Sequence, residues 1–215
     1  SRFVPKEVAN LSKGDIPRLS LKWSFGFPGA MRARSQPTVA MGAIFVGSQD
    51  GTVYALDLQS GCVRWAYEAS AEVRTGVVVA KHSVLGELAF FGDLIANVYA
   101  VKAKTGELVW KVSADNHHSA TITGTPAFYN DRLYVPVSSL EVIPAADPKY
   151  ECCTFRGHVL ALDASDGRTA WDSYSVDSDS EPVGETSFGT RILAPSGAPV
   201  WTSPTIFPSA NMLIF

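Results

Sequence analysis

Apolar and polar residues alternate with a period of two through most of this chain. Clear examples are "TVYALD" (52–57), "NVYAVK" (97–102) and "HVLALD" (158–163). Such alternation places every second side chain on one face of a β-strand, and it is typical of strands with a buried face. No segment of the sequence has a convincing amphipathic helical pattern of useful length. The pattern therefore predicts an all-β protein.

The alternating segments belong to a repeat that contains a tryptophan. In three stretches an alanine is followed ten residues later by a tryptophan, with a glycine between them: Ala55 and Trp65, Ala100 and Trp110, and Ala161 and Trp171. Trp23 has the surroundings expected at the end of an earlier copy. A tryptophan that returns at the same offset from the same turn is expected to pack between one sheet and the next.

Each copy also contains an upstream pair of strands, so four short strands recur about every 40–45 residues, which describes one blade of a β-propeller. The alternative is a β-sandwich, which does not explain the tryptophan spacing. The fold prediction is an incomplete β-propeller. Its full blades are expected at about 35–69, 73–114 and 120–175, with partial units at 1–34 and 195–215.

The third copy is longer than the others. Trp23 and Trp65 lie 42 residues apart, and Trp65 and Trp110 lie 45 apart, but Trp110 and Trp171 lie 61 apart. The excess falls in "SLEVIPAADPKYECCT" (139–154), which we interpret as an inserted loop. Two of the three cysteines in the chain are direct neighbours in this loop.

Composition narrows the classes of function. The chain has 215 residues, of which 46% are hydrophobic and 18% are charged, and its formal net charge is −3. It has no basic stripe, so nucleic acid is not expected as a partner. Its apolar runs are shorter than the roughly 20 residues of a transmembrane helix. The segment at Ser1 lacks a signal-peptide pattern, so we expect an export signal to be absent or already removed.

The repeat resembles the tryptophan-docking motif Ala-x-Asp-x-x-Thr-Gly-x-x-x-Trp of quinoprotein propellers. Residues 55–65 and 161–171 match it with Ser60 and Asp166 in place of threonine, and the middle copy has Lys102 in place of aspartate. The segments "PRLSLKWSFGFPGA", "ECCTFRG" and "GAPVWTSPT" are most similar to the polyvinyl-alcohol dehydrogenase branch. The resemblance covers nearly the whole chain. It implies an eight-bladed propeller of which about three full blades are present.

The resemblance implies that the complete protein oxidises an alcohol, which includes polyols or polymer alcohols, with pyrroloquinoline quinone (PQQ). It further implies a calcium ion, a cytochrome c electron acceptor and a periplasmic or secreted location. The catalytic base of such enzymes lies in later blades, so we expect this chain alone to be inactive. Open sheet edges predict self-association. The alternative is a scaffold that binds proteins, similar to outer-membrane assembly lipoproteins, which use such blades without a quinone.

Several residues match positions that contact PQQ in this family. They share one phase of the repeat, at the starts or just beyond the ends of inner strands: Gln36, Arg74, Thr123, Ser138 and Ser139. Glu141 falls near the calcium-binding glutamate of the family, one residue short of the usual spacing from the serines. A carboxylate oxygen is a suitable calcium ligand. A scaffold propeller would also place polar residues near its wet channel, so both interpretations stay open.

The family resemblance also implies a vicinal disulfide between Cys152 and Cys153 that lies against one face of PQQ, with Arg156 near a carboxylate of the quinone. Neighbouring Cα atoms lie about 3.8 Å apart across a trans peptide, which is closer than an ordinary disulfide allows. We therefore expect the joining peptide to be distorted or cis. In the methanol dehydrogenases the pair precedes the second inner strand, whereas here it follows Ser139. The alternative is two reduced, buried thiols.

The remaining candidates indicate less specific chemistry. His117 and His118 are adjacent but lack partners at ligand spacing, so we expect them to face solvent, with metal binding as the alternative. Cys62 follows the turn glycine Gly61 and is expected to stay unpaired. The acidic stretch "SVDSDSEPVGE" (175–185) is predicted to be a solvated loop between blades.

Overall fold

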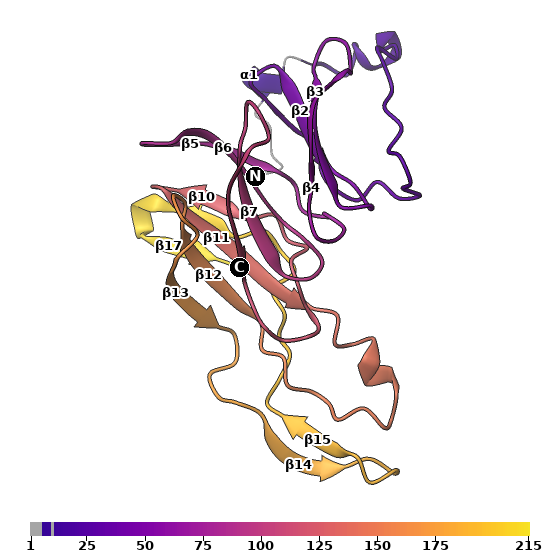
Figure 1. The fold of residues 1–215 in the computed structure, drawn as a ribbon, viewed down its shortest axis with the longest axis vertical. Helices are drawn as coiled ribbons and strands as arrows, with labels where there is room; N and C mark the ends of the chain where they lie inside the picture. Colours follow the sequence, from indigo (N-terminus) through magenta and orange to yellow (C-terminus); the bar gives the residue numbers. More distant parts are fainter. Residues whose placement is uncertain (1–5, 10) are drawn as a thin grey trace.

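The computed structural model describes residues 6–9 and 11–215, which form a series of antiparallel β-sheets (Figure 1). Helical structure in these residues is limited to single turns: α1 (Lys6–Ala9), η1 (Ile16–Arg18), η2 (Pro144–Ala146) and η3 (Pro208–Ala210). The prediction of an all-β protein is therefore confirmed. Within the described part of the chain, no helix is long and apolar enough to cross a membrane.

Three sheets have the strand order of propeller blades. Blade 1 consists of β1 (Thr38–Ala40), β2 (Ala43–Gly47), β3 (Thr52–Asp57) and β4 (Val63–Glu68). Blade 2 consists of β5 (Val78–His82), β6 (Gly86–Gly92), β7 (Asn97–Lys102) and β8 (Leu108–Ser113). Blade 3 consists of β10 (Ala127–Tyr129), β11 (Arg132–Ser139), β12 (His158–Asp163) and β13 (Thr169–Tyr174), and the short β9 (Ala120–Thr121) also pairs with β11. Apart from β9, each strand pairs with its neighbour in sequence.

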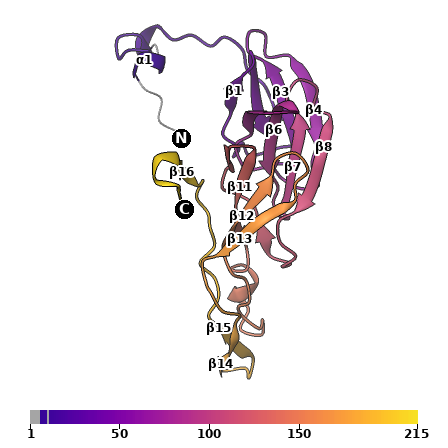
Figure 2. The same ribbon diagram turned by 90° about the vertical axis from the view of Figure 1, so that its left-hand side faces the viewer.

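Two hairpins complete the described structure. They are β14 (Glu181–Glu185) with β15 (Arg191–Ala194), and β16 (Thr205–Phe207) with β17 (Met212–Ile214). The prediction of a loop over 175–185 is thus wrong for its second half, which forms the exposed strand β14. Figure 2 shows the β14–β15 hairpin projecting away from the stacked blades.

The ten-residue offset between alanine and tryptophan becomes a cross-strand pair in each blade. Ala55 lies opposite Trp65, Ala100 opposite Trp110, and Ala161 opposite Trp171. The intervening turn glycines have φ between +74° and +76°, a backbone conformation that L side chains rarely adopt. The repeat in the sequence therefore reflects one hairpin built three times.

The core lies between blades, because each blade is apolar on both faces. Blade 1 contributes Phe45 and Trp65 to a buried cluster with Phe91 and Tyr99 of blade 2. The other face of blade 2 forms a second cluster with blade 3, in which Leu88, Phe90 and Trp110 pack with Leu133 and Leu160. Burial on both sides explains why the inner residues of β6 and β7 are almost continuously buried.

Each buried tryptophan docks on the next blade in the same way. The indole Nε1–H of Trp65 donates to the carbonyl of Ala103, and that of Trp110 donates to the carbonyl of Ala164, both at 2.9 Å. Each carbonyl stands three residues before a turn glycine on which the indole ring packs. Trp23 repeats the arrangement on blade 1, with a 3.2 Å bond to the carbonyl of Leu58. The predicted inter-blade packing is confirmed for Trp65 and Trp110.

The same prediction is wrong for Trp171, whose surface is 40% exposed. All of β13 is exposed, because the described residues after it form hairpins and no further sheet covers this face. Trp171 packs within its own blade on Tyr134, at 5.9 Å between ring centroids.

Candidate functional site

An open groove of about 1100 Å³ lies where the inner strands of four successive units begin. Its lining comes from segments within 34–38, 74–79, 123–128 and 201–206, which lead into β1, β5, β10 and β16. Three of the predicted site residues, Gln36, Arg74 and Thr123, line this groove together. The strand register therefore brings together side chains that are far apart in the sequence.

Equivalent positions of the repeat line the groove. Aligning the units by their inner strands places Arg34, Arg74, Thr123 and Trp201 at one position, and Gln36, Gly76, Thr125 and Ser203 at another. The backbone N–H of Gly76 donates to Oγ1 of Thr125 at 2.8 Å, and the N–H of Thr125 donates to Oγ of Ser203 at 3.2 Å. These bonds link the starts of three inner strands and fix the groove wall.

The groove carries an excess of positive charge. The guanidinium of Arg74 makes two bonds to the carboxylate of Glu72, at 2.9 and 3.1 Å. Nη1 of Arg34 lies 3.9 Å from the same carboxylate. Two guanidinium groups thus share one carboxylate, and this arrangement favours an anionic ligand. Paired planar guanidiniums are well suited to carboxylates, because they can donate two parallel bonds.

Two predicted residues lie behind the groove surface and do not line it. The hydroxyl of Ser138 is 3.3 Å from that of Thr123 and donates to the carbonyl of Thr121 at 3.1 Å, and Ser138 is fully buried. Ser139 is also buried and accepts the backbone N–H of Glu141 at 2.9 Å. Ser138 therefore orients Thr123 from behind, while Ser139 shapes the start of the inserted loop.

Glu141 stabilises the inserted loop (139–154) through hydrogen bonds. Its buried carboxylate accepts the backbone N–H groups of Thr154 and Phe155, at 2.9 and 3.1 Å, and the hydroxyl of Tyr150 at 3.3 Å. Nε2 of His117 lies 3.6 Å from it. In the residues that the structure describes, no three His, Cys, Asp or Glu side chains are grouped so that they could hold a metal. This arrangement does not fit a calcium ligand, and calcium at Glu141 stays a prediction.

The vicinal disulfide between Cys152 and Cys153 is present, and the peptide between them is cis. The pair lies against the β14–β15 hairpin: the N–H of Leu193 donates to the carbonyl of Cys152 at 2.7 Å, and the N–H of Cys153 donates to the carbonyl of Leu193 at 3.4 Å. Arg191 and Glu151 add an ion pair of 2.6 Å. Neither cysteine lines the groove. The predicted position of the disulfide against a quinone stays a prediction.

Arg156 is also held away from the groove. Its guanidinium lies 4.3 Å above the ring of Tyr174 and pairs with Asp179 at 2.7 Å. His118 is exposed, as predicted, whereas His117 differs from the prediction: it contacts Oγ1 of Thr154 at 3.0 Å and its side chain is 16% exposed. Cys62 is exposed and unpaired, as predicted.

Three residues that line the groove were not predicted from the sequence: Arg34, Trp201 and Ser203. Their signal was the repeat register: each occupies the position in its unit that Arg74 or Gln36 occupies in another. Extending the alignment from the tryptophan turn to the start of the inner strand would have identified all three.

A buried histidine next to the inserted loop was also not predicted. His158 in β12 lies between two carboxylates: Nδ1 is 2.6 Å from Asp172 and Nε2 is 3.1 Å from Asp115. Its ring stacks on Tyr174 at 4.8 Å. Burial acts to lower the pKa of His158, but the nearby carboxylate of Asp115 and the hydrogen-bonded carboxylate of Asp172 outweigh burial and raise it. Asp115 belongs to the connection between blades 2 and 3, so this ion cluster ties that connection to blade 3.

We expect the thermal stability to fall as the pH rises through the raised pKa of His158. The folded state binds the imidazolium proton more tightly than the unfolded state, so this contribution is complete below about pH 6.5 and is lost above the folded pKa. Melting temperatures measured between pH 5 and pH 9 should show this decrease. The variant His158→Gln should reduce the slope. If the melting temperature of this variant falls with pH as steeply as that of wild type, another titrating group causes the decrease.

Comparison with known proteins identifies the class. A model of the PQQ-repeat family, described as "Outer membrane protein assembly factor BamB", matches residues 3–143. The match covers more than half of the chain, which therefore belongs to this family of PQQ-type β-propellers.

Within the family, the chain is similar to quinoprotein alcohol dehydrogenases. It is 34% identical to polyvinylalcohol dehydrogenase of Pseudomonas sp. and 35% identical to that of Sphingopyxis sp. strain 113P3, over 99% and 100% of this chain. It spans about a third of these relatives, 33% and 32% of their lengths.

Solved structures agree with this similarity. Quinohemoprotein alcohol dehydrogenase ADHIIG of Pseudomonas putida HK5 superposes with a TM-score of 0.63 at 25% identity, over 84% of this chain and 27% of that one. A europium-containing methanol dehydrogenase superposes with a TM-score of 0.59 at 28% identity, over 78% and 29%. The expected resemblance to PQQ-dependent alcohol dehydrogenases, including the polyvinyl-alcohol branch, is confirmed.

Proposed function

We propose that this chain forms part of the quinone-binding face of a PQQ-dependent alcohol dehydrogenase. The observation that carries the proposal is the groove at the inner strands, where Arg34 and Arg74 share the single carboxylate of Glu72. PQQ is a flat tricarboxylate, so a site for it needs cations, hydrogen-bond donors and a flat wall. The groove offers the two guanidiniums, the hydroxyl of Thr123 and the indole of Trp201.

Each of these residues has a distinct role in the proposed site. Arg74 binds a carboxylate of the ligand, and Glu72 fixes the plane of its guanidinium through two bonds. Arg34 supplies the charge that Glu72 does not neutralise. Thr123 donates its hydroxyl to the ligand, because its neighbour Ser138 is directed to the carbonyl of Thr121. Gln36 provides an amide at the wall of blade 1.

The activity of the complete protein follows from this site only by proposal. PQQ, when bound, supplies an electrophilic carbonyl that takes up a hydride equivalent from an alcohol. We place the base that accepts the alcohol proton outside residues 1–215, so this chain alone is expected not to oxidise alcohols. An alcohol or polymer alcohol substrate, a cytochrome c acceptor and a periplasmic location are part of the same proposal.

Self-association is a further part of the proposal. In β13 all residues are exposed, and Trp171, at 40% exposure, stands where the equivalent tryptophans of the other two blades are covered by the next blade. Light scattering at high protein concentration tests it, and a monodisperse monomer would contradict it.

PQQ titration of the purified chain tests the quinone site. We expect saturable binding by calorimetry, and we expect Arg74→Ala to weaken it by about 10- to 100-fold, since one charge-assisted bond contributes about 1.5–3 kcal/mol. The matched control is Arg168→Ala, because Arg168 is 84% exposed and lies outside the groove. If PQQ does not bind wild type, or binds wild type and Arg74→Ala with equal affinity, the groove is not the quinone site. The protein-binding scaffold would then be favoured.

A further inference from the structure

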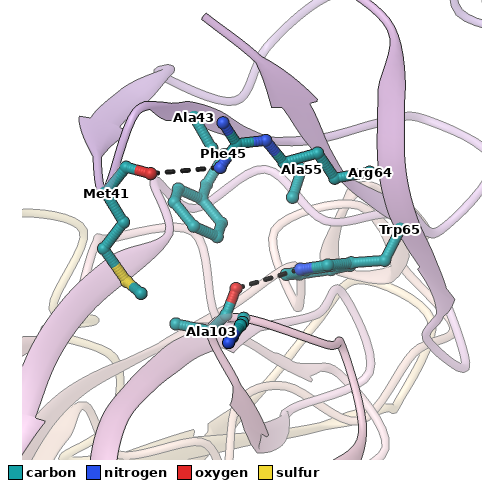
Figure 3. A pocket seen from close by; sticks show the side chains of 8 residues that line it. Met41, Ala43, Phe45, Ala55, Arg64, Trp65 and Ala103 are labelled. Carbon is teal, nitrogen blue, oxygen red and sulfur yellow. Dashed lines mark hydrogen bonds between the residues drawn. The ribbon is translucent and has the colours of Figure 1, made fainter.

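A second cavity, of about 300 Å³, lies between blade 1 and the turn that joins β7 to β8 (Figure 3). Phe45 and Trp65 form its aromatic wall, with ring centroids 5.8 Å apart. The indole N–H is already bonded to the carbonyl of Ala103, so the indole presents carbon surface to the cavity. Both blades around it are complete, which makes the cavity independent of the quinone groove.

The equivalent space between blades 2 and 3 is filled. Strand register places Ala43 and Leu88 at the same position, opposite Asp57 and Lys102. Leu88 is fully buried against the second tryptophan cluster, whereas Ala43 leaves the corresponding volume open. The smaller side chain of Ala43 therefore opens a cavity at this interface, where Leu88 occupies the equivalent position of the next one.

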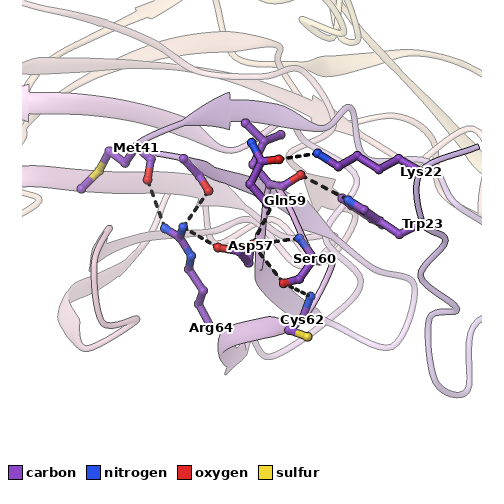
Figure 4. Close-up of polar contacts among 10 residues, drawn as sticks. Lys22, Trp23, Met41, Asp57, Gln59, Ser60, Cys62 and Arg64 are labelled. Carbon is purple, nitrogen blue, oxygen red and sulfur yellow. Dashed lines mark hydrogen bonds and ion pairs between the residues drawn. The ribbon is translucent and has the colours of Figure 1, made fainter. Parts of the chain in front are cut away.

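The cavity is also lined by charged side chains that are absent from the equivalent positions between blades 2 and 3. Arg64 and Lys104 line it, where the second interface has Val109 and Ser165. The guanidinium of Arg64 donates to the carbonyls of Met41 and Gly42, at 3.1 and 2.7 Å, and to the carboxylate of Asp57 at 2.8 Å (Figure 4). These contacts hold the group in place and leave part of its five N–H donors available.

The net charge at the cavity mouth is positive. The hydrogen bond from Arg64 lowers the pKa of Asp57, so the two form a neutral ion pair. Lys104 has no ion pair among the residues that the structure describes. One cation is thus left without a partner beside an aromatic wall.

We propose that this cavity binds a small aromatic monocarboxylate, with its ring against Phe45 and Trp65 and its carboxylate at Lys104 and the free edge of Arg64. A volume of about 300 Å³ is at the lower end of the range for ligand sites, and it suits a single ring with a short side chain. A monoanion matches the single unpaired cation, while the aromatic wall favours a ring over an aliphatic chain.

Calorimetric titration with phenylacetate tests the proposal, and phenylacetamide serves as the uncharged analogue of the same size. Wild type is expected to bind phenylacetate saturably and phenylacetamide at least fivefold more weakly. Protein NMR should show the indole N–H resonance of Trp65 shifting with phenylacetate. Equal affinity for the two compounds, or no saturable binding of phenylacetate, overturns the proposal.

Two variants test whether the ligand binds in this cavity. Each replaces a lining residue with the one found at the equivalent position between blades 2 and 3. Ala43→Leu fills the cavity with the side chain found at Leu88 and is expected to abolish binding. Lys104→Ser restores the residue found at Ser165 and is expected to weaken binding about threefold to fivefold, as for an exposed ion pair. Lys81→Ser is the control, since it removes one exposed charge from blade 2 outside the cavity.

Using two variants keeps the test valid if one of them fails to fold. Lys104 is exposed, so Lys104→Ser is expected to fold even if Ala43→Leu does not. If both variants fold and bind phenylacetate as wild type does, the ligand lies elsewhere and the proposal is wrong.

Discussion

Replacing Trp110 with alanine is expected to lower the free energy of unfolding by about 3–5 kcal/mol, the usual cost of removing a large buried aromatic side chain. Trp110 is 7% exposed, packs with Phe90 and donates its indole N–H to the carbonyl of Ala164. The substitution removes this bond and leaves the carbonyl without its partner inside the interface. Urea denaturation followed by circular dichroism measures the change.

Trp171→Ala is the matched control for this prediction, because Trp171 has the same place in the repeat but no covering blade. Its removal should cost about 1 kcal/mol or less, as for most exposed positions. Similar losses in the two variants would mean that the tryptophan stabilises its own blade and not the interface.

Gly106→Ala is expected to cost about 3 kcal/mol for two reasons that add. Gly106 has φ of +75°, which costs an L residue about 1–2 kcal/mol. A Cβ there would also lie 2.8 Å from the ring of Trp65, and overpacking of this kind costs about 1–3 kcal/mol.

Gly86→Ala separates the two contributions. Gly86 is in the same blade and has φ of +77°, but a Cβ there meets nothing within 4 Å. It should therefore cost only the backbone contribution, about 1–2 kcal/mol. If both glycine variants lose the same stability by urea denaturation, contact with the indole ring does not restrict position 106.

The fold could be predicted because its signals are local. The offset from Ala100 to Trp110 is set by one hairpin, and the positive φ of Gly106 is set by one turn. Strand alternation and turn glycines are properties of short segments, so a single sequence shows them. The recurrence of the same tryptophan hairpin along the chain then indicated that the blades stack on one another.

Contacts between distant segments could not be predicted in this way. One such contact is the bridge between Cys152 and Ile192 of β15, which lies 40 residues later in the chain. Another is the carboxylate of Glu141, which accepts the backbone N–H groups of Thr154 and Phe155. No local pattern encodes which partner such a side chain meets.

The residues of the groove could be predicted only in part. Gln36, Arg74 and Thr123 were found because family resemblance and repeat phase agree for them. Arg34 was missed because the expected start of the first full blade, residue 35, falls directly after it. Glu72 was missed because its role depends on the two arginines that it joins.

The docking of each tryptophan on the next blade makes the molecule a one-dimensional chain of neighbours. The bond from Trp65 crosses only the first interface and that from Trp110 only the second, with blade 2 between them. Stability in such an array is close to a sum of nearest-neighbour contributions. Substitutions at the two interfaces should therefore behave additively, so one interface can acquire a cavity and new charges while the other keeps its packing.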